Sequence, residues 1–181
     1  MEKLMQKLKK SLATIQRYMT FQHINLYASL ACLALFGFAA YLQFVHSMEP
    51  CPLCILQRLI VVLVGLVFFA GIFLRPTMRK AMFLQSICGV VFSVFGMLLS
   101  ARHMWLQYNA DSTSASCGPS LDYMLEHFPL VDVVRTMIKG GGHCHKINWE
   151  LLGLTIPEWT FSFFVFFAVI GLFNAWRAMR H

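Results

Sequence analysis

The sequence predicts an all-α membrane protein: a four-transmembrane-helix bundle with two outward loops and a short amphipathic helix at the membrane interface. Two observations support this class. Of the 181 residues, 58% are hydrophobic and 13% are charged, whereas a soluble domain of this size needs more charge on its surface. Four separate runs are long and apolar enough to span a bilayer, which takes about 20 helical residues. We expect a single membrane domain over residues 1–181.

Each predicted span is a continuous apolar run. The four runs cover about residues 26–45, 55–74, 81–99 and 159–176. Hydrocarbon holds no water for backbone groups, so only helices and closed barrels cross it, and these runs are too long and too apolar for barrel strands. The first run has full span length, and no small-x-small cleavage site follows it before residues 46–54. We therefore do not expect a cleaved signal peptide.

Basic residues are distributed unequally between the two sides of the predicted bundle. Four spans place both termini and the connector RPTMRK on one side, which carries ten lysines and arginines. The opposite side clearly carries three, namely Arg135, Lys139 and Lys146. Because positive residues stay on the cytoplasmic side, this asymmetry predicts that both termini are cytoplasmic. It also accounts for most of the net charge of +7, so the expected partner is the lipid bilayer and not nucleic acid.

The six cysteines fall into three pairs. Cys51 and Cys54 lie in an outward loop of about residues 46–54, and Cys117 and Cys144 lie in an outward loop of about residues 100–158. Outside the cytoplasmic membrane of a bacterium, thiols meet an oxidising compartment, so two cysteines per loop suggest two disulfides. Cys32 and Cys88 lie inside the first and third spans, where we expect them only to pack as small hydrophobic side chains.

The two outward pairs differ in spacing. A bridge within C-x-x-C closes a very short ring, which makes it a poor staple and more often redox-active than structural. Cys117 and Cys144 enclose a longer segment that suits an ordinary staple. However, the run of residues 140–142 is all glycine and would let Cys144 move while Cys117 stays in place. That mobility suits disulfide exchange better than a rigid staple.

A short amphipathic helix is predicted within the long loop, after Pro129. Its apolar face consists of five residues: Leu130, Val133, Val134, Met137 and Ile138. A helix of this kind between two spans is expected to lie flat in the membrane interface. The alternative is that it packs against a neighbouring subunit.

A cation and a histidine accompany the first cysteine pair. Cys54 begins the second span, where the positive end of a helix stabilises a thiolate, and Arg58 follows one turn later on the same face. An ionisable residue at this depth is expected to hold a polar group of a membrane-soluble molecule, and a quinone carbonyl fits; the alternative is snorkelling to headgroups. His103 lies at similar depth and would donate to the same ring or carry a proton, or is merely structural.

These residues resemble the DsbB family of bacterial inner-membrane proteins. The resemblance covers nearly the whole chain and rests on CPLCILQR, CGPSLDYMLEHFPL and LLGLTIPEW. It implies a protein-dithiol:quinone oxidoreductase of the inner membrane, with its cysteine loops in the periplasm. Such a protein reoxidises a periplasmic DsbA-like dithiol and passes two electrons to the membrane quinone pool. The quinone would be ubiquinone or menaquinone, and no metal is expected.

The resemblance also implies a role for each matching residue. Cys117 would be attacked by the reduced partner, and the freed Cys144 would attack Cys51. Cys54 would then remain as a thiolate against the quinone, which Arg58 would hold with His103 nearby. The implied disulfides are Cys51–Cys54 and Cys117–Cys144. The flanking residues His143 and His145 are not part of the family's pattern.

Three other interpretations remain open at this point. Cys51, Cys54, Cys144 and either His143 or His145 would suit a structural zinc site of three cysteines and one histidine. The chain would otherwise be a related membrane oxidoreductase with a different partner or quinone. Finally, it would be a purely structural membrane protein with two disulfide staples.

Overall fold

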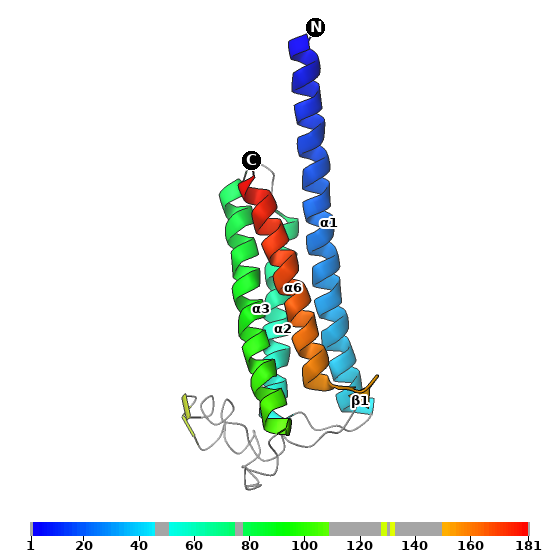
Figure 1. Ribbon diagram of the computed structural model, residues 1–181, viewed down its shortest axis with the longest axis vertical. Helices are drawn as coiled ribbons and strands as arrows, with labels where there is room; N and C mark the ends of the chain where they lie inside the picture. Colours follow the sequence, from blue (N-terminus) through cyan, green and yellow to red (C-terminus); the bar gives the residue numbers. More distant parts are fainter. Residues whose placement is uncertain are drawn as a thin grey trace.

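The structure, a computed structural model, confirms the four-helix membrane class. It describes residues 2–45, 51–74, 78–108, 128–129, 131–132 and 150–180, and only the backbone of 2–18, 150 and 151. Four helices in these ranges are long and apolar enough to cross a membrane: α1 (Glu2–Val45), α2 (Pro52–Ile72), α3 (Arg79–Tyr108) and α6 (Ile156–Met179). The start of α1 and the end of α6 lie at the same end of the bundle (Figure 1).

Two of the helices are longer than the apolar runs that predicted them. Helix α1 begins at Glu2, although only Met19–Val45 is apolar enough to span a membrane. Helix α3 continues to Tyr108, well past the predicted end near residue 99. Neither extension contains glycine or proline, so nothing breaks the helix where the apolar run ends. As a result, His103 lies on a helix and not in a loop.

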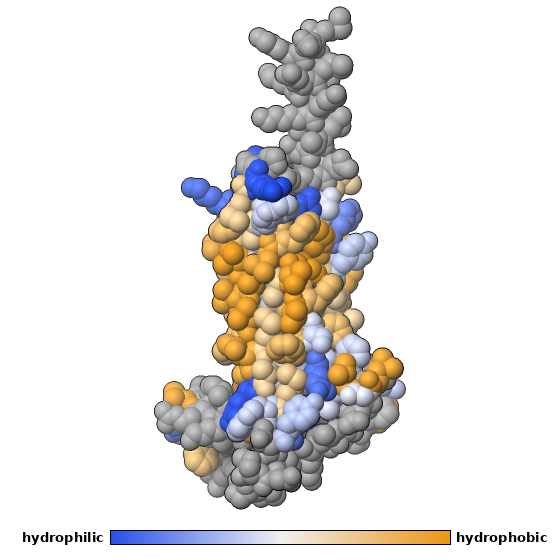
Figure 2. Space-filling view, viewed as in Figure 1, coloured by the Kyte–Doolittle hydropathy of each residue, from blue (hydrophilic) through white to orange (hydrophobic). Residues whose placement is uncertain are grey.

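The helices pack in chain order around a common core. Helix α2 packs between α1 and α3, and α3 packs most extensively against α6, whereas α1 and α6 touch at few positions. An apolar band covers the middle of the bundle between hydrophilic ends (Figure 2). Helix α2 supplies more of the core side chains than any other helix, and the rings of Phe68 on α2 and Phe167 on α6 are 6.1 Å apart. The bundle thus has an apolar exterior of membrane-spanning height around an aromatic centre.

Small residues let α3 and α6 approach closely. The buried face of α3 includes Ser86, Gly89, Ser93, Gly96 and Ser100. A Cβ atom built on Gly96 would lie 2.5 Å from two ring atoms of Phe164, a side chain with no exposed surface. Membrane helices have no hydrophobic drive to associate within lipid, so close backbone packing of this kind holds them together.

Replacing Gly96 by alanine is therefore expected to destabilise the bundle. The buried Phe164 ring cannot yield without disturbing its neighbours, and overpacking of this kind costs about 1–3 kcal/mol of unfolding free energy. Thermal or denaturant unfolding in detergent measures the loss. Gly37→Ala is the matched control because no atom lies within 4 Å of its added Cβ. Equal stabilities for the two variants would contradict the importance of this contact.

Polar side chains connect three helices at the end of the bundle opposite to the start of α2. The Nε2 group of Gln85 donates to Asn25 Oδ1 at 3.3 Å and to the Val67 carbonyl at 3.1 Å. Gly71 makes room for this cluster, since a Cβ there would lie 2.9 Å from both side chains. The sequence analysis did not anticipate this bridge between α1, α2 and α3.

A small hairpin that the sequence analysis did not predict leads into α6. Strands β1 (Glu150–Leu151) and β2 (Leu154–Thr155) pair antiparallel, with positive φ at both turn residues, Leu152 and Gly153. Thr155 then donates from its backbone nitrogen and its hydroxyl to Glu158 Oε2, at 2.6 and 3.0 Å. This bonding defines the start of α6.

Helices α3 and α6 are also joined at the ends that lie near the hairpin. The hydroxyl of Tyr108, the last residue of α3, donates to Glu158 Oε1 at 2.5 Å. The predicted amphipathic helix between α3 and the hairpin lies largely outside the described residues, of which only Val131 and Asp132 are helical there. Its position in the interface therefore stays a prediction.

Candidate redox site

The first cysteine pair lies at the start of α2. Cys51 is the N-cap residue, with extended backbone angles, and its sulfur accepts a hydrogen bond from the backbone nitrogen of Cys54 at 3.4 Å. Pro52 occupies the first turn, where its fixed φ suits a helix start and its missing N–H costs nothing. The C-x-x-C spacing thus joins the N-cap position to the third helical residue. This brings the two Sγ atoms to 3.2 Å from each other.

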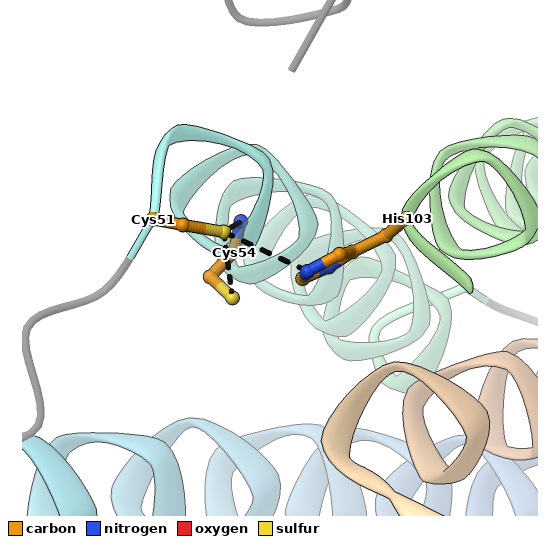
Figure 3. Close-up of side chains that lie close together, drawn as sticks. All are labelled: Cys51, Cys54 and His103. Carbon is orange, nitrogen blue, oxygen red and sulfur yellow. Dashed lines mark hydrogen bonds between the residues drawn. The ribbon is translucent and has the colours of Figure 1, made fainter. Parts of the chain in front are cut away.

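His103 approaches this pair from α3. Its Nε2 atom lies 3.8 Å from the sulfur of Cys51, and its Nδ1 atom lies 3.5 Å from Nε2 of Gln57 (Figure 3 shows the histidine and both cysteines). His103 and Gln57 are each only 3% exposed. The imidazole is therefore held between a thiol and an amide, away from water.

The two cysteines differ in accessibility. Cys51 is buried, with 8% of its surface exposed, whereas Cys54 is half-buried. Both sulfurs lie at the N-terminus of α2, where the unpaired backbone N–H groups carry partial positive charge. The thiolate is the reactive form of cysteine. A membrane-soluble reactant would reach Cys54 more readily than Cys51.

Arg58 lies one turn beyond Cys54 but turns towards α1. Its Nη1 donates to Gln43 Oε1 at 2.5 Å, and its Nη2 donates to the backbone carbonyl of Ala39 at 3.1 Å. A guanidinium has five N–H donors, so these two bonds to α1 use only part of its capacity. The side chain is half-buried. The arginine is thus a cation held between α1 and α2.

The site also meets one geometric criterion for metal binding. Cys51, Cys54 and His103 each offer one ligand atom, and these three atoms all lie within 4.8 Å of one another. The zinc alternative suggested by the sequence used a different set, whose members Cys144, His143 and His145 lie outside the described residues. His103 is therefore the only histidine in the described part of the chain that joins the cysteine pair in such a group.

The structure places some of the predicted site residues and leaves their roles as predictions. It brings Cys51, Cys54 and His103 together and leaves Arg58 nearby on the same helix as the cysteines. Cys117 and Cys144 lie outside the described residues, so their pairing and roles stay predictions, as does the Cys51–Cys54 disulfide. Sequence reasoning missed two polar residues, Gln57 and Gln43. Glutamines inside or beside an apolar run were the available signal for both.

The chain has four apolar helices, and a thiol pair with a buried histidine lies at the N-terminal end of one of them. These features define a multi-pass membrane protein with thiol-disulfide chemistry. Comparison with known proteins gives the family. The pattern of the family described as "Disulfide bond formation protein DsbB" matches residues 21–174. The chain belongs to the DsbB family, whose members are membrane-bound and act as disulfide oxidoreductases.

Individual relatives agree with this assignment over most of their length. A disulfide bond formation protein B from Hahella chejuensis is 40% identical over 159 residues, covering 88% of this chain and 95% of the relative. Proteins of the same name are similar in Polaromonas sp., with 43% identity over 84% of this chain and 89% of the relative, and in Nitrosococcus oceani, with 38% identity over 81% and 86%. The resemblance stated from sequence motifs is thereby confirmed.

Proposed function

We propose that this protein reoxidises a DsbA-like dithiol protein and passes the two electrons through two cysteine pairs to a membrane quinone. The observation that carries the proposal is the close pair of Cys51 and Cys54 sulfurs, 3.2 Å apart at the start of an apolar helix, in a chain of the DsbB family. A redox pair placed there is within reach both of a water-soluble protein and of a molecule dissolved in lipid.

The electrons move by thiol-disulfide exchange between the two pairs. The partner's dithiol reduces the Cys117–Cys144 disulfide and becomes a disulfide itself. The thiolate of Cys144 then attacks the sulfur of Cys51, the Cys51–Cys54 bond breaks, and Cys54 leaves as a thiolate. Cys117 next attacks Cys144, which re-forms the Cys117–Cys144 disulfide and leaves Cys51 and Cys54 both reduced. When bound, a quinone supplies the terminal acceptor, taking up two electrons and two protons. Each exchange forms one sulfur–sulfur bond and breaks another, so the two electrons are conserved.

The residues around Cys54 fit a quinone. The half-buried sulfur is the exposed member of the pair, and the positive end of α2 favours its thiolate form. Arg58 has N–H donors beyond the two that bind α1, and these suit a carbonyl oxygen. Nε2 of His103 lies 3.8 Å from the sulfur of Cys51, and the ring is also a candidate quinone ligand.

The proposed reaction requires a strong final oxidant. A DsbA-like protein is itself a strong oxidant, with a reduction potential of about −120 mV. Its reoxidation therefore needs a still better electron acceptor, which a quinone pool supplies. We propose that both termini are cytoplasmic and that the start of α2 faces the periplasm of the bacterial inner membrane. The excess of lysine and arginine near the termini and the 75–80 connector supports this orientation.

An anaerobic assay with purified protein tests the proposal. A reduced DsbA-like protein is added to the chain in detergent with excess ubiquinone, or with menaquinone in a parallel run, and quinone absorbance is followed. We expect one quinone to be lost for each partner dithiol oxidised. Absence of any loss, with the four outward cysteines present as inert disulfides, would instead support a structural membrane protein.

A further inference from the structure

Three potential metal ligands lie close together at the N-terminal end of α2 when its cysteines are reduced. The two sulfurs are 3.2 Å apart, and Nε2 of His103 lies 3.8 Å from the sulfur of Cys51. All three ligand atoms lie within 4.8 Å of one another (Figure 3). Two thiolates and one imidazole are a donor set that Zn²⁺ and similar cations prefer.

The distances are close to those of a tetrahedral zinc site. With Zn–S of about 2.3 Å and Zn–N of about 2.0–2.1 Å, tetrahedral angles place two sulfurs about 3.8 Å apart and a sulfur about 3.6 Å from a nitrogen. The observed separations of 3.2 and 3.8 Å differ from these values by about 0.6 Å or less, and the Cys54 sulfur lies within 4.8 Å of Nε2 of His103. Cys54 has the most room to adjust because it is only half-buried. The described residues supply only these three ligands, so the fourth position is left to water or to a ligand outside them.

The surroundings of His103 also suit a metal ligand. A neutral imidazole that coordinates through Nε2 carries its proton on Nδ1, and an outer partner must accept that proton. Gln57 lies at this position, 3.5 Å from Nδ1, and a half-turn of its amide presents the oxygen. Because both side chains are 3% exposed, this partner is shielded from competition with water.

We propose that the reduced Cys51–Cys54–His103 cluster binds a thiophilic divalent cation such as Zn²⁺, and that the bound cation blocks electron transfer to quinone. Binding displaces two thiol protons and transfers no electron. The disulfide form lacks anionic sulfur donors, so the cation is an inhibitor of one redox state and not a resident cofactor. The blocking step rests on the function proposed above, whereas binding does not.

The block follows from what coordination does to the sulfurs. A metal-bound Cys54 sulfur shares the electron pair with which it would attack an acceptor. A metal-bound Cys51 sulfur cannot re-form the disulfide with Cys54 until the cation leaves. The site would therefore stay reduced at high zinc, and a chelator would restore turnover.

Cobalt binding tests the site directly. Co²⁺ is titrated into the anaerobically reduced Cys117→Ser/Cys144→Ser chain in detergent, and the sulfur-to-cobalt charge-transfer band is followed, with Zn²⁺ added afterwards as competitor. His143 and His145 contain no sulfur and cannot produce this band. We expect one Co²⁺ per reduced chain with a tetrahedral visible spectrum, displacement by Zn²⁺, and no band in the oxidised chain.

Two substitutions examine the third ligand and its outer partner. Gln57→Leu should weaken cobalt affinity roughly 10- to 100-fold, as loss of an outer partner does, and His103→Ala should weaken it more. His23→Ala, an exposed histidine on α1, is the matched control and should leave the affinity unchanged. Should His103→Ala fail to fold, protection of both thiols from alkylation by Zn²⁺ in the unmodified reduced chain provides an independent measurement.

The outcomes separate the two parts of the proposal. A cobalt spectrum without sulfur ligation would overturn the site. So would an oxidised chain, or a reduced His103→Ala variant, that binds cobalt as tightly as the reduced parent. Quinone reduction at an unchanged rate with stoichiometric Zn²⁺ bound would overturn the block. A chain that never reduces quinone, even without metal, would refute the proposed function while the cobalt titration still reports on the site.

Discussion

Cys54→Ser is expected to abolish quinone reduction by this protein, lowering the rate by roughly a thousandfold or more, as removal of an essential nucleophile does. A serine hydroxyl cannot form a disulfide with Cys51, and it is not ionised where a thiolate at the start of α2 would be. The measurement is anaerobic single turnover with a reduced DsbA-like protein, in which quinone absorbance is followed over time. Oxidation of the partner should stop after one equivalent, which the Cys117–Cys144 disulfide still accepts.

The matched control for this experiment is Cys88→Ser. Cys88 is a half-buried free cysteine within α3, so the change introduces the same hydroxyl elsewhere in the bundle. We expect Cys88→Ser to retain the parental rate. Quinone loss at the parental rate in Cys54→Ser would show that another group delivers the electrons, and the proposed path would have to be abandoned.

Arg58→Met is expected to raise the KM for quinone roughly tenfold to a hundredfold while changing the reaction with the partner protein little. A hydrogen bond from a charged donor contributes about 1.5–3 kcal/mol, and each 1.4 kcal/mol is a factor of ten. Methionine keeps much of the aliphatic volume without the cation. Steady-state rates at varied quinone, and separately at varied partner, measure the two constants.

Gln43→Leu is the matched control for Arg58. It removes the 2.5 Å bond between α1 and α2 but keeps the guanidinium, so its quinone KM should change much less. If Arg58 only joins the two helices, the two variants will have equal quinone KM values. That result would assign Arg58 a structural role and leave the quinone-binding residues to be found elsewhere.

The position of His103 changes its interpretation. From the sequence, its depth alone placed it beside Arg58 and a shared quinone ring. In the structure, its Nε2 atom faces the sulfur of Cys51, and Arg58 contacts α1. The two residues thus flank the cysteine pair from different helices. Each can act on a different sulfur, with Arg58 nearer in sequence to Cys54 and His103 nearer in space to Cys51.

The sequence by itself determined the class of protein and the position of its first cysteine pair. Span length depends on bilayer thickness, so four apolar runs sufficed to predict four helices. The proximity of Cys51 to Cys54 is also local, because an N-cap and the third helical residue meet whenever a helix starts there. Helix ends were less predictable. The apolar run stops near residue 99, but the residues after it still favour a helix, so α3 continues to Tyr108.

Only the tertiary structure decided which side chains from other helices join that pair. In a membrane bundle the lipid-facing and core-facing sides are both apolar, so hydrophobic periodicity does not reveal which face of a helix is buried. Leu98 is exposed and Leu99, its neighbour on α3, is buried, although their chemistry is the same. The contacts of His103 with Cys51 and of Arg58 with Gln43 depend on how the helices are rotated. That rotation is decided by close packing such as Gly96 against Phe164, which no single helix contains.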